Sequence, residues 1–176
     1  MNYFISDLHF GHANIIKLCN RPFNNVDEMN EVLINNWNKR VHKNDNVYIV
    51  GDLFFRMVGN PESILDRLKG NKYLIKGNHD KTWIKKVDLE KYFKVVTDIY
   101  TFNDGQRKLT LCHYPMMDFE GKYLIYGHIH ANKDDFYWEL LSGMDNALNA
   151  GADIHNFTPV TFDELVVNNE KFKGND

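Results

Sequence analysis

The chain has 176 residues, of which 43% are apolar and 26% are charged, and its formal net charge is −3. This composition excludes a globally disordered protein. It also argues against a protein whose main role is to coat nucleic acid, although it leaves room for a nuclease with a local basic patch.

The length predicts a single domain over residues 1–176. No apolar run is long enough to span a membrane, and the N-terminus lacks the features of a secretory signal. The two cysteines, Cys19 and Cys112, are too few for a disulfide framework and fit a reduced, cytoplasmic setting. The sequence contains no internal repeat and sets no oligomeric state.

Short strands and helices alternate in the first half of the chain. Runs of branched and aromatic residues predict strands over 2–6, 47–50 and 72–76. Apolar residues at helical spacing predict helices over 13–19, 27–40 and 61–69. This alternation is typical of an α/β layered fold, in which ligands gather at the carboxyl ends of the strands.

The second half is richer in strands. Residues 81–92 carry four lysines, which we interpret as a solvated helix face in preference to a nucleic-acid patch. A hairpin signal, Asn103-Asp104-Gly105, joins strands predicted over 94–101 and 107–112. Further strands are predicted over 123–126, 136–143 and 158–162, and a last short helix begins at Asp163.

Polar side chains of the kinds that bind metals follow five of these strands. In chain order they are Asp7 and His9, Asp52, Asn78 and His79, His113, and His128 and His130. In extended backbone, a spacing of two residues places both side chains of a pair on one side, where they can share a metal. Five of the eight histidines occupy these positions, whereas satisfied core histidines would scatter along strands and helices.

Seven of these residues are candidate ligands, which is too many for one tetrahedral ion. They are Asp7, His9, Asp52, Asn78, His113, His128 and His130. Their oxygen and imidazole donors suit two divalent ions that share a carboxylate, with manganese favoured and iron, zinc, nickel or magnesium also compatible. Paired ions are the usual device for in-line displacement at phosphorus. We therefore expect a metal-dependent phosphoesterase in which a hydroxide between the ions attacks the phosphorus.

The motif at residues 77–80 assigns different tasks to neighbouring side chains. Gly77 permits a close backbone approach. Asn78 and His79 are adjacent, so in extended backbone their side chains diverge. We expect Asn78 to face a metal and His79 to face the substrate, where it would act as a general acid. Asp80 could orient His79 or face water.

Other candidate substrate contacts are weaker. His12 and Asn14 follow the first motif, where a helix N-cap or loop-packing role is an equal alternative. Arg56 comes four residues after the second motif and could clamp a phosphate bidentately, and Arg21 is a weaker candidate still. We expect the two remaining histidines to lie on the surface: His42 and His155.

The ordered set of motifs resembles the calcineurin-like metallophosphoesterase superfamily. The matching blocks are Asp7-Leu8-His9, Gly51-Asp52, Gly77-Asn78-His79-Asp80, His113 and Gly127-His128-Ile129-His130. The resemblance implies an α/β fold, a four-layer αββα sandwich of two mixed sheets flanked by helices. It places the metal site at the carboxyl-terminal edge of the strands, and it fits the small single-domain members often encoded by bacteria and phages.

The resemblance also implies a role for each ligand. One ion would be held by Asp7, His9, Asp52 and His130. The other would be held by Asp52, Asn78, His113 and His128. Asp52 would bridge the two ions, and His79 would contact the phosphate or protonate the leaving oxygen without binding a metal.

Three hypotheses follow. The leading one is hydrolysis of a phosphodiester, in a small molecule or nucleotide, with a monoester left open. The second is a non-catalytic metal-binding scaffold of the same fold, which the loss of a ligand or of His79 would favour; none is lost. The third is a nuclease, favoured if the lysine-bearing face of residues 81–91 adjoins the site.

Overall fold

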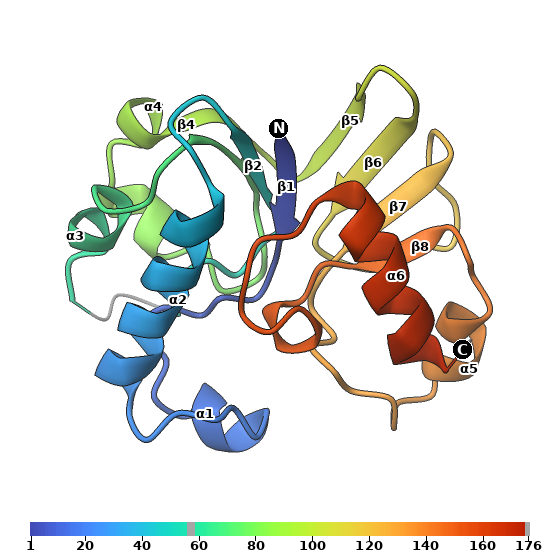
Figure 1. Ribbon diagram of the computed structural model, residues 1–176, viewed down its shortest axis with the longest axis horizontal. Helices are drawn as coiled ribbons and strands as arrows, with labels where there is room; N and C mark the ends of the chain where they lie inside the picture. The colour runs from blue at the N-terminus through green and yellow to red at the C-terminus, as the bar shows by residue number, and fades with distance from the viewer. Residues whose placement is uncertain (56–58, 175–176) are drawn as a thin grey trace.

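The computed structural model describes residues 1–55 and 59–174, and its strands form two sheets of four (Figure 1). The first sheet contains, in spatial order, β1 (Asn2–Ile5), β2 (Asn46–Ile49), β3 (Asn71–Ile75) and β4 (Phe93–Thr97). The second contains β5 (Ile99–Asn103), β6 (Lys108–Cys112), β7 (Tyr123–Tyr126) and β8 (Ala147–Asn149).

Strand direction differs between the two sheets. All pairs of the first sheet are parallel, because each of its strands is reached through a helical crossover. In the second sheet β5 is antiparallel to β6, whereas β6, β7 and β8 are parallel. Only the second sheet is therefore mixed, which corrects the expectation of two mixed sheets. The parallel strands of each sheet end at a common edge.

Helices cover the outer faces of the two sheets. On the first sheet these are α1 (Ile15–Leu18), α2 (Val26–Arg40), α3 (Pro61–Leu65), the 3₁₀ turn η1 (Trp83–Lys86) and α4 (Leu89–Tyr92). The later elements are α5 (Trp138–Ser142), the 3₁₀ turn η2 (Ala152–Ile154) and α6 (Phe162–Lys173). In Figure 1, α6 runs alongside the second sheet near β8, and it contacts both β1 and β8.

Three apolar clusters separate the layers and confirm the four-layer sandwich. In β1, Ile5 faces the helix-covered cluster that contains Trp37 of α2, while Phe4 faces the cluster between the sheets. The third cluster lies on the outer face of the second sheet, where Leu141 of α5 packs near Leu124 of β7. The alternation along β1 thus buries both of its faces.

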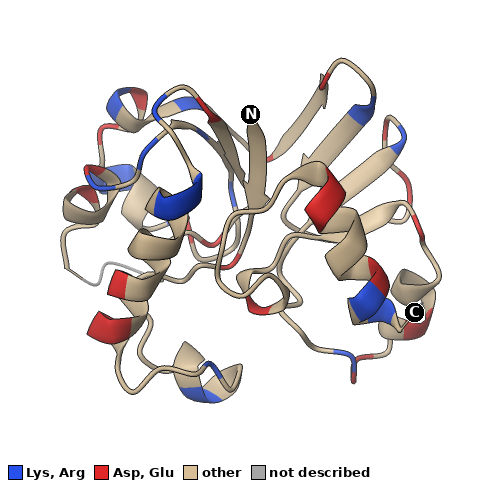
Figure 2. Ribbon diagram, viewed as in Figure 1, with Lys and Arg blue, Asp and Glu red and all other residues tan. Residues whose placement is uncertain are grey.

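Charge is distributed along α2 as the helix dipole favours. The helix begins with Asp27 and Glu28 and ends with Lys39 and Arg40, so its first turn is acidic and its last turn basic (Figure 2). The side chain of Asn25 accepts a hydrogen bond from the Glu28 N–H at 2.9 Å and caps the helix. The sequence prediction of this helix is confirmed.

The predicted strand over 136–143 is wrong, because residues 138–142 form α5. This aromatic and apolar run has strand propensity, but Trp138 and Leu141 lie three apart and pack together on the outer face of the second sheet as a helix. The predicted strand over 158–162 is reduced to one antiparallel bridge between Phe4 and Val160, and Phe162 already begins α6.

The predicted strand over 94–101 is divided between the two sheets. β4 ends at Thr97 and β5 begins at Ile99, so the chain leaves one sheet and enters the other at Asp98. The hairpin between β5 and β6 is confirmed, with the Asp104 N–H donating to the Arg107 carbonyl at 3.0 Å. The sequence prediction missed β8, whose Ala-Leu-Asn sequence carries little strand signal.

Candidate metal centre

Backbone hydrogen bonds draw the strand ends of both sheets to one place. The Ser6 N–H donates to the Ala150 carbonyl at 2.8 Å, and the Ala152 N–H donates to the Ser6 carbonyl at 2.9 Å. These bonds join the end of β1 to the end of β8. Within the first sheet, the Asp7 N–H donates to the Gly51 carbonyl at 3.0 Å. All seven predicted ligands thereby lie near the line where the two sheets meet.

The loops that carry the ligands adopt an unusual backbone conformation. Eight non-glycine residues of the described chain have a positive φ, and five of these are predicted ligands. These five are Asp7, His9, Asp52, His128 and His130, with φ between 52° and 73°. Left-handed conformations of non-glycine residues are uncommon and cluster at functional sites, where surrounding contacts hold them in place.

Two glycines of the motifs stand where no side chain fits. A Cβ on Gly77 would lie 2.2 Å from Asp52 Oδ1, and one on Gly127 would lie 1.8 Å from Ser6 Oγ and 2.6 Å from Asp7 Oδ2. These contacts are far shorter than van der Waals distance. The glycines therefore allow the backbone to approach the two carboxylates of the site.

The first group of ligands converges on Asp7. Asp7 Oδ1 lies 3.9 Å from His9 Nε2 and 4.0 Å from His130 Nε2, and His9 Nε2 lies 3.7 Å from Asp52 Oδ2. These separations are too long for hydrogen bonds. Ligands about 2.1 Å from one tetrahedral ion are roughly 3.4 Å apart, so the separations fit side chains arranged around an ion.

The second group surrounds Asn78. Its Oδ1 lies 3.1 Å from both His113 Nε2 and His128 Nδ1, and His113 Nε2 lies 3.4 Å from Asp52 Oδ2. Asp52 Oδ2 is therefore close to a ring nitrogen of each group. The structure thus brings together the two sets of residues that the resemblance implies.

Unpaired buried atoms at the first group fit a cation. Asp7 Oδ2 accepts hydrogen bonds from Ser6 Oγ at 2.6 Å and from the His128 N–H at 2.9 Å. Asp7 Oδ1 and His9 Nε2 are buried, and neither forms a hydrogen bond with any residue in the described part of the chain. Burying an unpaired polar group costs about 1–3 kcal/mol. A divalent ion between these two atoms would offset that cost.

The charge states of His9 and Asp52 suit metal binding, whereas, against the opposing effect of burial, the Asp52 hydrogen bond raises the pKa of His113 to about 9 and the Asp153 hydrogen bond raises that of His130 to about 10. Both of those rings must release a proton when they bind an ion. Burial lowers the pKa of His9 well below its usual value, so the neutral ring keeps the lone pair that a ligand needs. Burial alone would raise the pKa of Asp52, but the hydrogen bond and charge of His113 outweigh it and lower this pKa to about 2. The His113 Nδ1–H donates to the Val50 carbonyl at 2.9 Å, which turns Nε2 toward Asp52.

His79 lies at the rim of the site, outside both groups. Its side chain is 36% exposed, and its Nε2 lies 4.0 Å from Asp52 Oδ2. Its ring meets that of His9 edge-on, with centroids 5.3 Å apart, whereas Asn78 points to the second group. The two neighbouring side chains diverge as expected, but they lie in a turn and not in the extended backbone on which that expectation rests.

Asp80 neither orients His79 nor faces water, so both expectations for it are wrong. It is fully buried, and its carboxylate accepts hydrogen bonds from the N–H groups of Gly77 at 2.7 Å and Asp52 at 2.8 Å. The indole N–H of Trp83 donates a third, also at 2.7 Å. Asp80 therefore connects the loop of Gly77 to the loop of Asp52 by hydrogen bonds, and both loops carry ligands.

The weaker substrate candidates have different positions. His12 is buried beside the site, its ring stacked on Phe55 at a centroid distance of 3.5 Å and 5.4 Å from that of His9. Asn14 occupies the N-cap position of α1 with its side chain exposed and no capping hydrogen bond. Arg56 lies outside the described residues.

Two predictions about single residues are corrected. Arg21 is not available to a phosphate, because it is buried and its guanidinium is paired with Asp153 at 2.8 Å. His155 is not a surface residue; it is 2% exposed and its Nε2–H donates to the Asn149 carbonyl at 2.8 Å. His42 is exposed as expected. Arg21 and His155 are buried through the loop after β8, since Asp153 of that loop pairs with Arg21 and His155 itself lies in it. The sequence prediction missed this strand.

Sequence reasoning also missed three residues that touch the site. Asp153 accepts a hydrogen bond from His130 Nδ1 at 2.8 Å, Ser6 holds Asp7, and Cys19 lies within 4.8 Å of ligand atoms of both His130 and Asp153. Ser6 precedes the first motif and could have been found there. Asp153 comes 23 residues after His130 and follows no predicted strand, so no sequence signal marks it.

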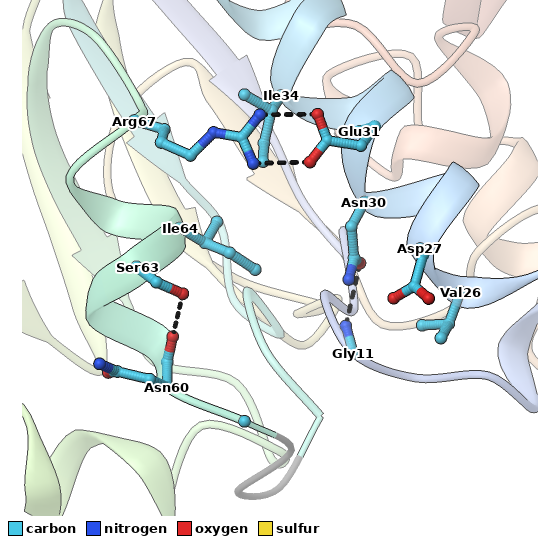
Figure 3. Close-up of a pocket in the computed structure, with 11 residues that line it drawn as sticks. Gly11, Val26, Asp27, Asn30, Glu31, Ile34, Asn60, Ser63, Ile64 and Arg67 are labelled. Atoms are coloured by element: carbon cyan, nitrogen blue, oxygen red, sulfur yellow. Dashed lines mark hydrogen bonds and ion pairs between the residues drawn. The ribbon is translucent and has the colours of Figure 1, made fainter.

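Two hollows flank the site. One of about 520 Å³ opens against His128 and His130 and is also lined by Asp134 and Asp135. The other, of about 450 Å³, lies between α2 and α3, next to the loop before His12 (Figure 3). In it, Asn30 Oδ1 accepts a hydrogen bond from the Gly11 N–H, and an Arg67–Glu31 ion pair lies at the rim.

None of the helices formed by the described residues combines the length and the apolar character that a membrane span requires.

Relatives identified by sequence share most of the chain. An uncharacterized protein of Methanocaldococcus jannaschii, MJ1445, is 40% identical, and the match covers 97% of this chain and 92% of that protein. The Gene 66 protein of Mycobacterium phage L5 is 28% identical, with 73% of this chain and 77% of that protein covered.

Solved structures and a family model place the fold. The protein of unknown function AQ665 from Aquifex aeolicus superimposes with a TM-score of 0.74 at 26% identity, covering 94% of this chain and 97% of that chain. The nuclease MPE of Pseudomonas putida, at a TM-score of 0.53 and 17% identity over 73% of this chain and 61% of that chain, shares the fold alone. The family model for calcineurin-like phosphoesterases matches residues 3–143. The chain therefore belongs to the calcineurin-like phosphoesterase family.

Proposed function

We propose that the chain is a dinuclear metal-dependent phosphoesterase that hydrolyses phosphodiesters. The observation that carries this proposal is the position of Asp52 Oδ2, 3.7 Å from His9 Nε2 and 3.4 Å from His113 Nε2. A carboxylate oxygen between two groups of ligands is what two divalent ions sharing a carboxylate require. The oxygen and imidazole donors favour manganese over ions that prefer thiolates.

Each ion has its own set of proposed ligands. Asp7, His9, Asp52 and His130 would hold one, and Asp52, Asn78, His113 and His128 the other. Two such ions would supply the Lewis acidity and the activated hydroxide that displacement at phosphorus needs. The chain's own contribution is to hold these donors in fixed directions, with Asp52 ionised and His9 neutral.

His79 is the proposed general acid. Its partly exposed ring stands at the rim, where a bound phosphoester would meet it, and its backbone N–H is fixed to Asp52 Oδ1 at 2.9 Å. Protonated at Nε2, the ring would donate its proton to the departing oxygen. His12, buried within 6.5 Å of His79 between ring centroids, is a proposed substrate contact. The exposed Asn14 and Arg56, which lies outside the described residues, remain weaker proposals.

Two exposed acidic side chains beside the site favour a diester over a monoester, in opposition to the positive charge of the proposed ions, which attracts both substrates. The hollow beside His128 and His130 carries two acidic residues, Asp134 and Asp135. A phosphomonoester has a charge of about −1.5 to −2 at pH 7, whereas a diester has a single negative charge. Repulsion by the acidic residues would therefore weaken binding of the monoester more than that of the diester.

Turnover of two aryl substrates by the manganese-loaded protein tests this proposal. We expect hydrolysis of bis-p-nitrophenyl phosphate to exceed that of p-nitrophenyl phosphate. Asp52→Asn should reduce the diester rate by about 10³-fold or more, since it removes a shared ligand. The matched control is Asp163→Asn, an exposed carboxylate on α6 whose loss should leave the rate unchanged. A protein that binds two ions and hydrolyses neither substrate would instead be a binding scaffold.

A nuclease is the second candidate, favoured by the position of Lys81. This lysine is exposed and comes two residues after His79, whereas Lys91 is paired with Asp66 at 3.5 Å. The solved nuclease MPE shares the fold of this chain. If the chain is a nuclease, it should cleave a single-stranded oligonucleotide, and Lys81→Ala should weaken that cleavage while Lys91→Ala does not. An intact oligonucleotide after incubation with active enzyme would rule this candidate out.

A further inference from the structure

Arg21 and Asp153 form a buried pair immediately behind the first group of ligands. Arg21 Nε donates to Asp153 Oδ1 at 2.8 Å and Nη2 donates to Asp153 Oδ2 at 3.0 Å. The side chain of Arg21 is fully buried, and that of Asp153 is 5% exposed. This two-point contact fixes the planes of both groups relative to each other.

The same guanidinium also holds the loop that carries two ligands. Nη2 donates to the carbonyl of Asp7 at 2.7 Å, and Nη1 donates to that of Leu8 at 2.9 Å. Asp7 and His9 both have a positive φ, at 56° and 54°. Such conformations persist only where surrounding contacts hold them, and the carbonyls bonded by Arg21 lie within this strained segment.

Asp153 continues the chain of contacts to a third ligand. Its Oδ2 accepts a hydrogen bond from His130 Nδ1–H at 2.8 Å, which leaves Nε2 of that ring facing Asp7 Oδ1. The backbone of His130 is held as well, because Asn149 Nδ2 donates to its carbonyl at 2.7 Å. A ring whose far nitrogen is bonded to a carboxylate is oriented and made a stronger metal ligand.

The free energy of folding alone gives little reason for a buried ion pair such as Arg21–Asp153. Replacing a buried ion pair by apolar residues of similar volume is often neutral or stabilising, because two charges must be removed from water. Here, however, the pair connects residues from three distant parts of the sequence, and its bonds to Asp7, Leu8 and His130 all go to ligand-bearing loops. Arg21 also contacts the Met29 sulfur at 3.6 Å and the Phe157 ring, which lie outside those loops. The contacts therefore favour a role in arranging the ligands.

We propose that Arg21 and Asp153 are positioning residues that hold Asp7, His9 and His130 as one unit and thereby set the affinity of the ion bound there. The inference rests on the proposed function in that it assumes an ion at this group. The second group lies outside this network: Asn78, His113 and His128 make no contact with Arg21 or Asp153 among the contacts of the described residues.

Titration of the metal-free protein with Mn²⁺ in a calorimeter tests the proposal. The wild-type chain should bind two ions. In Asp153→Asn, which keeps the shape of the side chain and removes its charge, one ion should bind about 10–100-fold more weakly and the other as before. His128→Ala disrupts the second group, so that one ion remains. Adding Asp153→Asn to this variant should lower the affinity for that remaining ion. Unchanged affinity for both ions in a folded Asp153→Asn protein would overturn the proposal.

Two controls separate positioning from folding. Glu164→Gln alters another arginine–carboxylate pair, more exposed than Arg21–Asp153. Arg40 Nη2 lies 2.8 and 2.7 Å from the two oxygens of Glu164, and this pair touches no ligand. The substitution should leave metal affinity unchanged. Should Asp153→Asn not fold, Arg21→Lys takes its place, because it keeps the positive charge and removes the two-point hydrogen bonding of the guanidinium. It should weaken the same ion, and wild-type affinity there would overturn the proposal.

Cys19 provides a test of a competing arrangement. Its sulfur forms a possible ligand cluster with His130 and Asp153. Cys19→Ser should leave the affinity for both ions unchanged if Asp153 acts through His130. A loss as large as that of Asp153→Asn would instead place an ion at that cluster and contradict the proposal. Because binding is measured, a wild-type protein that binds two ions without hydrolysing any phosphoester would refute the proposed function alone.

Discussion

Two ligands of the first group, Asp7 and His130, are oriented by contacts on the side away from each other. Asp7 is held by Ser6 and His130 by Asp153, so that Oδ1 and Nε2 face each other across 4.0 Å. His113 is fixed in the same way by the Val50 carbonyl. Preorganised donors of this kind reduce the cost of binding a cation, since little side-chain entropy remains to be lost.

His79 should matter most where the leaving group is poor. His79→Asn should retain both ions and the fold, because its ring lies outside both ligand groups. It should reduce turnover of a nucleoside or alkyl diester by about 10²–10⁴-fold and that of a nitrophenyl diester less, since a good leaving group departs without a proton. Equal losses on both substrates would make His79 an electrostatic stabiliser of the phosphoryl oxygens, and loss of metal would make it a ligand.

His155 should limit stability in acid. Burial lowers its pKa to about 4, below the ordinary value of about 6.5. The unfolded chain therefore binds this proton at a higher pH than the folded one. The stability that the neutral His155 contributes is complete above pH 6.5 and is lost as the pH falls through 4. The shift corresponds to on the order of 3 kcal/mol.

Chemical denaturation of the metal-free protein between pH 4 and pH 7 measures this effect. His155→Gln should flatten the decline in unfolding free energy over that interval, while His42→Gln, at an exposed position, should not. Identical pH slopes for wild type and His155→Gln would show that other groups cause the loss.

The ligands could be predicted from sequence because they follow strongly apolar strands, whereas the residues that hold them could not. Val47 to Val50 leads directly to Asp52, and such runs mark where a strand ends. Asp153 and His155 follow β8, a three-residue strand of sequence Ala-Leu-Asn that is buried only because its neighbours surround it. Burial of this kind is a tertiary effect that local propensity does not carry.

The ligand-bearing loops depend on close packing between the ends of neighbouring strands. Gly127→Ala should displace Ser6 and Asp7, because its Cβ would lie 1.8 Å from Ser6 Oγ. We expect loss of the ion at the first group and a lower melting temperature. Gly143→Ala is the matched control: a Cβ there meets the Leu140 carbonyl at 3.5 Å and the Glu139 carbonyl at 3.8 Å, both ordinary contacts, so stability should change by less than about 0.5 kcal/mol. Normal metal affinity in Gly127→Ala would show that the loop accommodates a side chain.

For the whole molecule, bound ions should contribute to stability. The ligands come from both sheets, so an ion binds only the folded chain and stabilises it by mass action, by about 2.7 kcal/mol at 100 times its Kd. For a chain of this size, removal of the ions by a chelator should lower the melting temperature by about 5–10 °C and abolish activity together. An unchanged melting curve in chelator would mean that the ligands are not assembled in the folded state.

The number of ions bound per chain tests the shared role of Asp52 most directly. Elemental analysis of manganese-loaded protein after dialysis should give two ions per chain for the wild type. Asp52→Ala should retain neither, because the carboxylate lies within reach of both groups, 3.7 Å from His9 Nε2 and 3.4 Å from His113 Nε2. One ion retained at full occupancy in folded Asp52→Ala protein would contradict a bridged dinuclear centre.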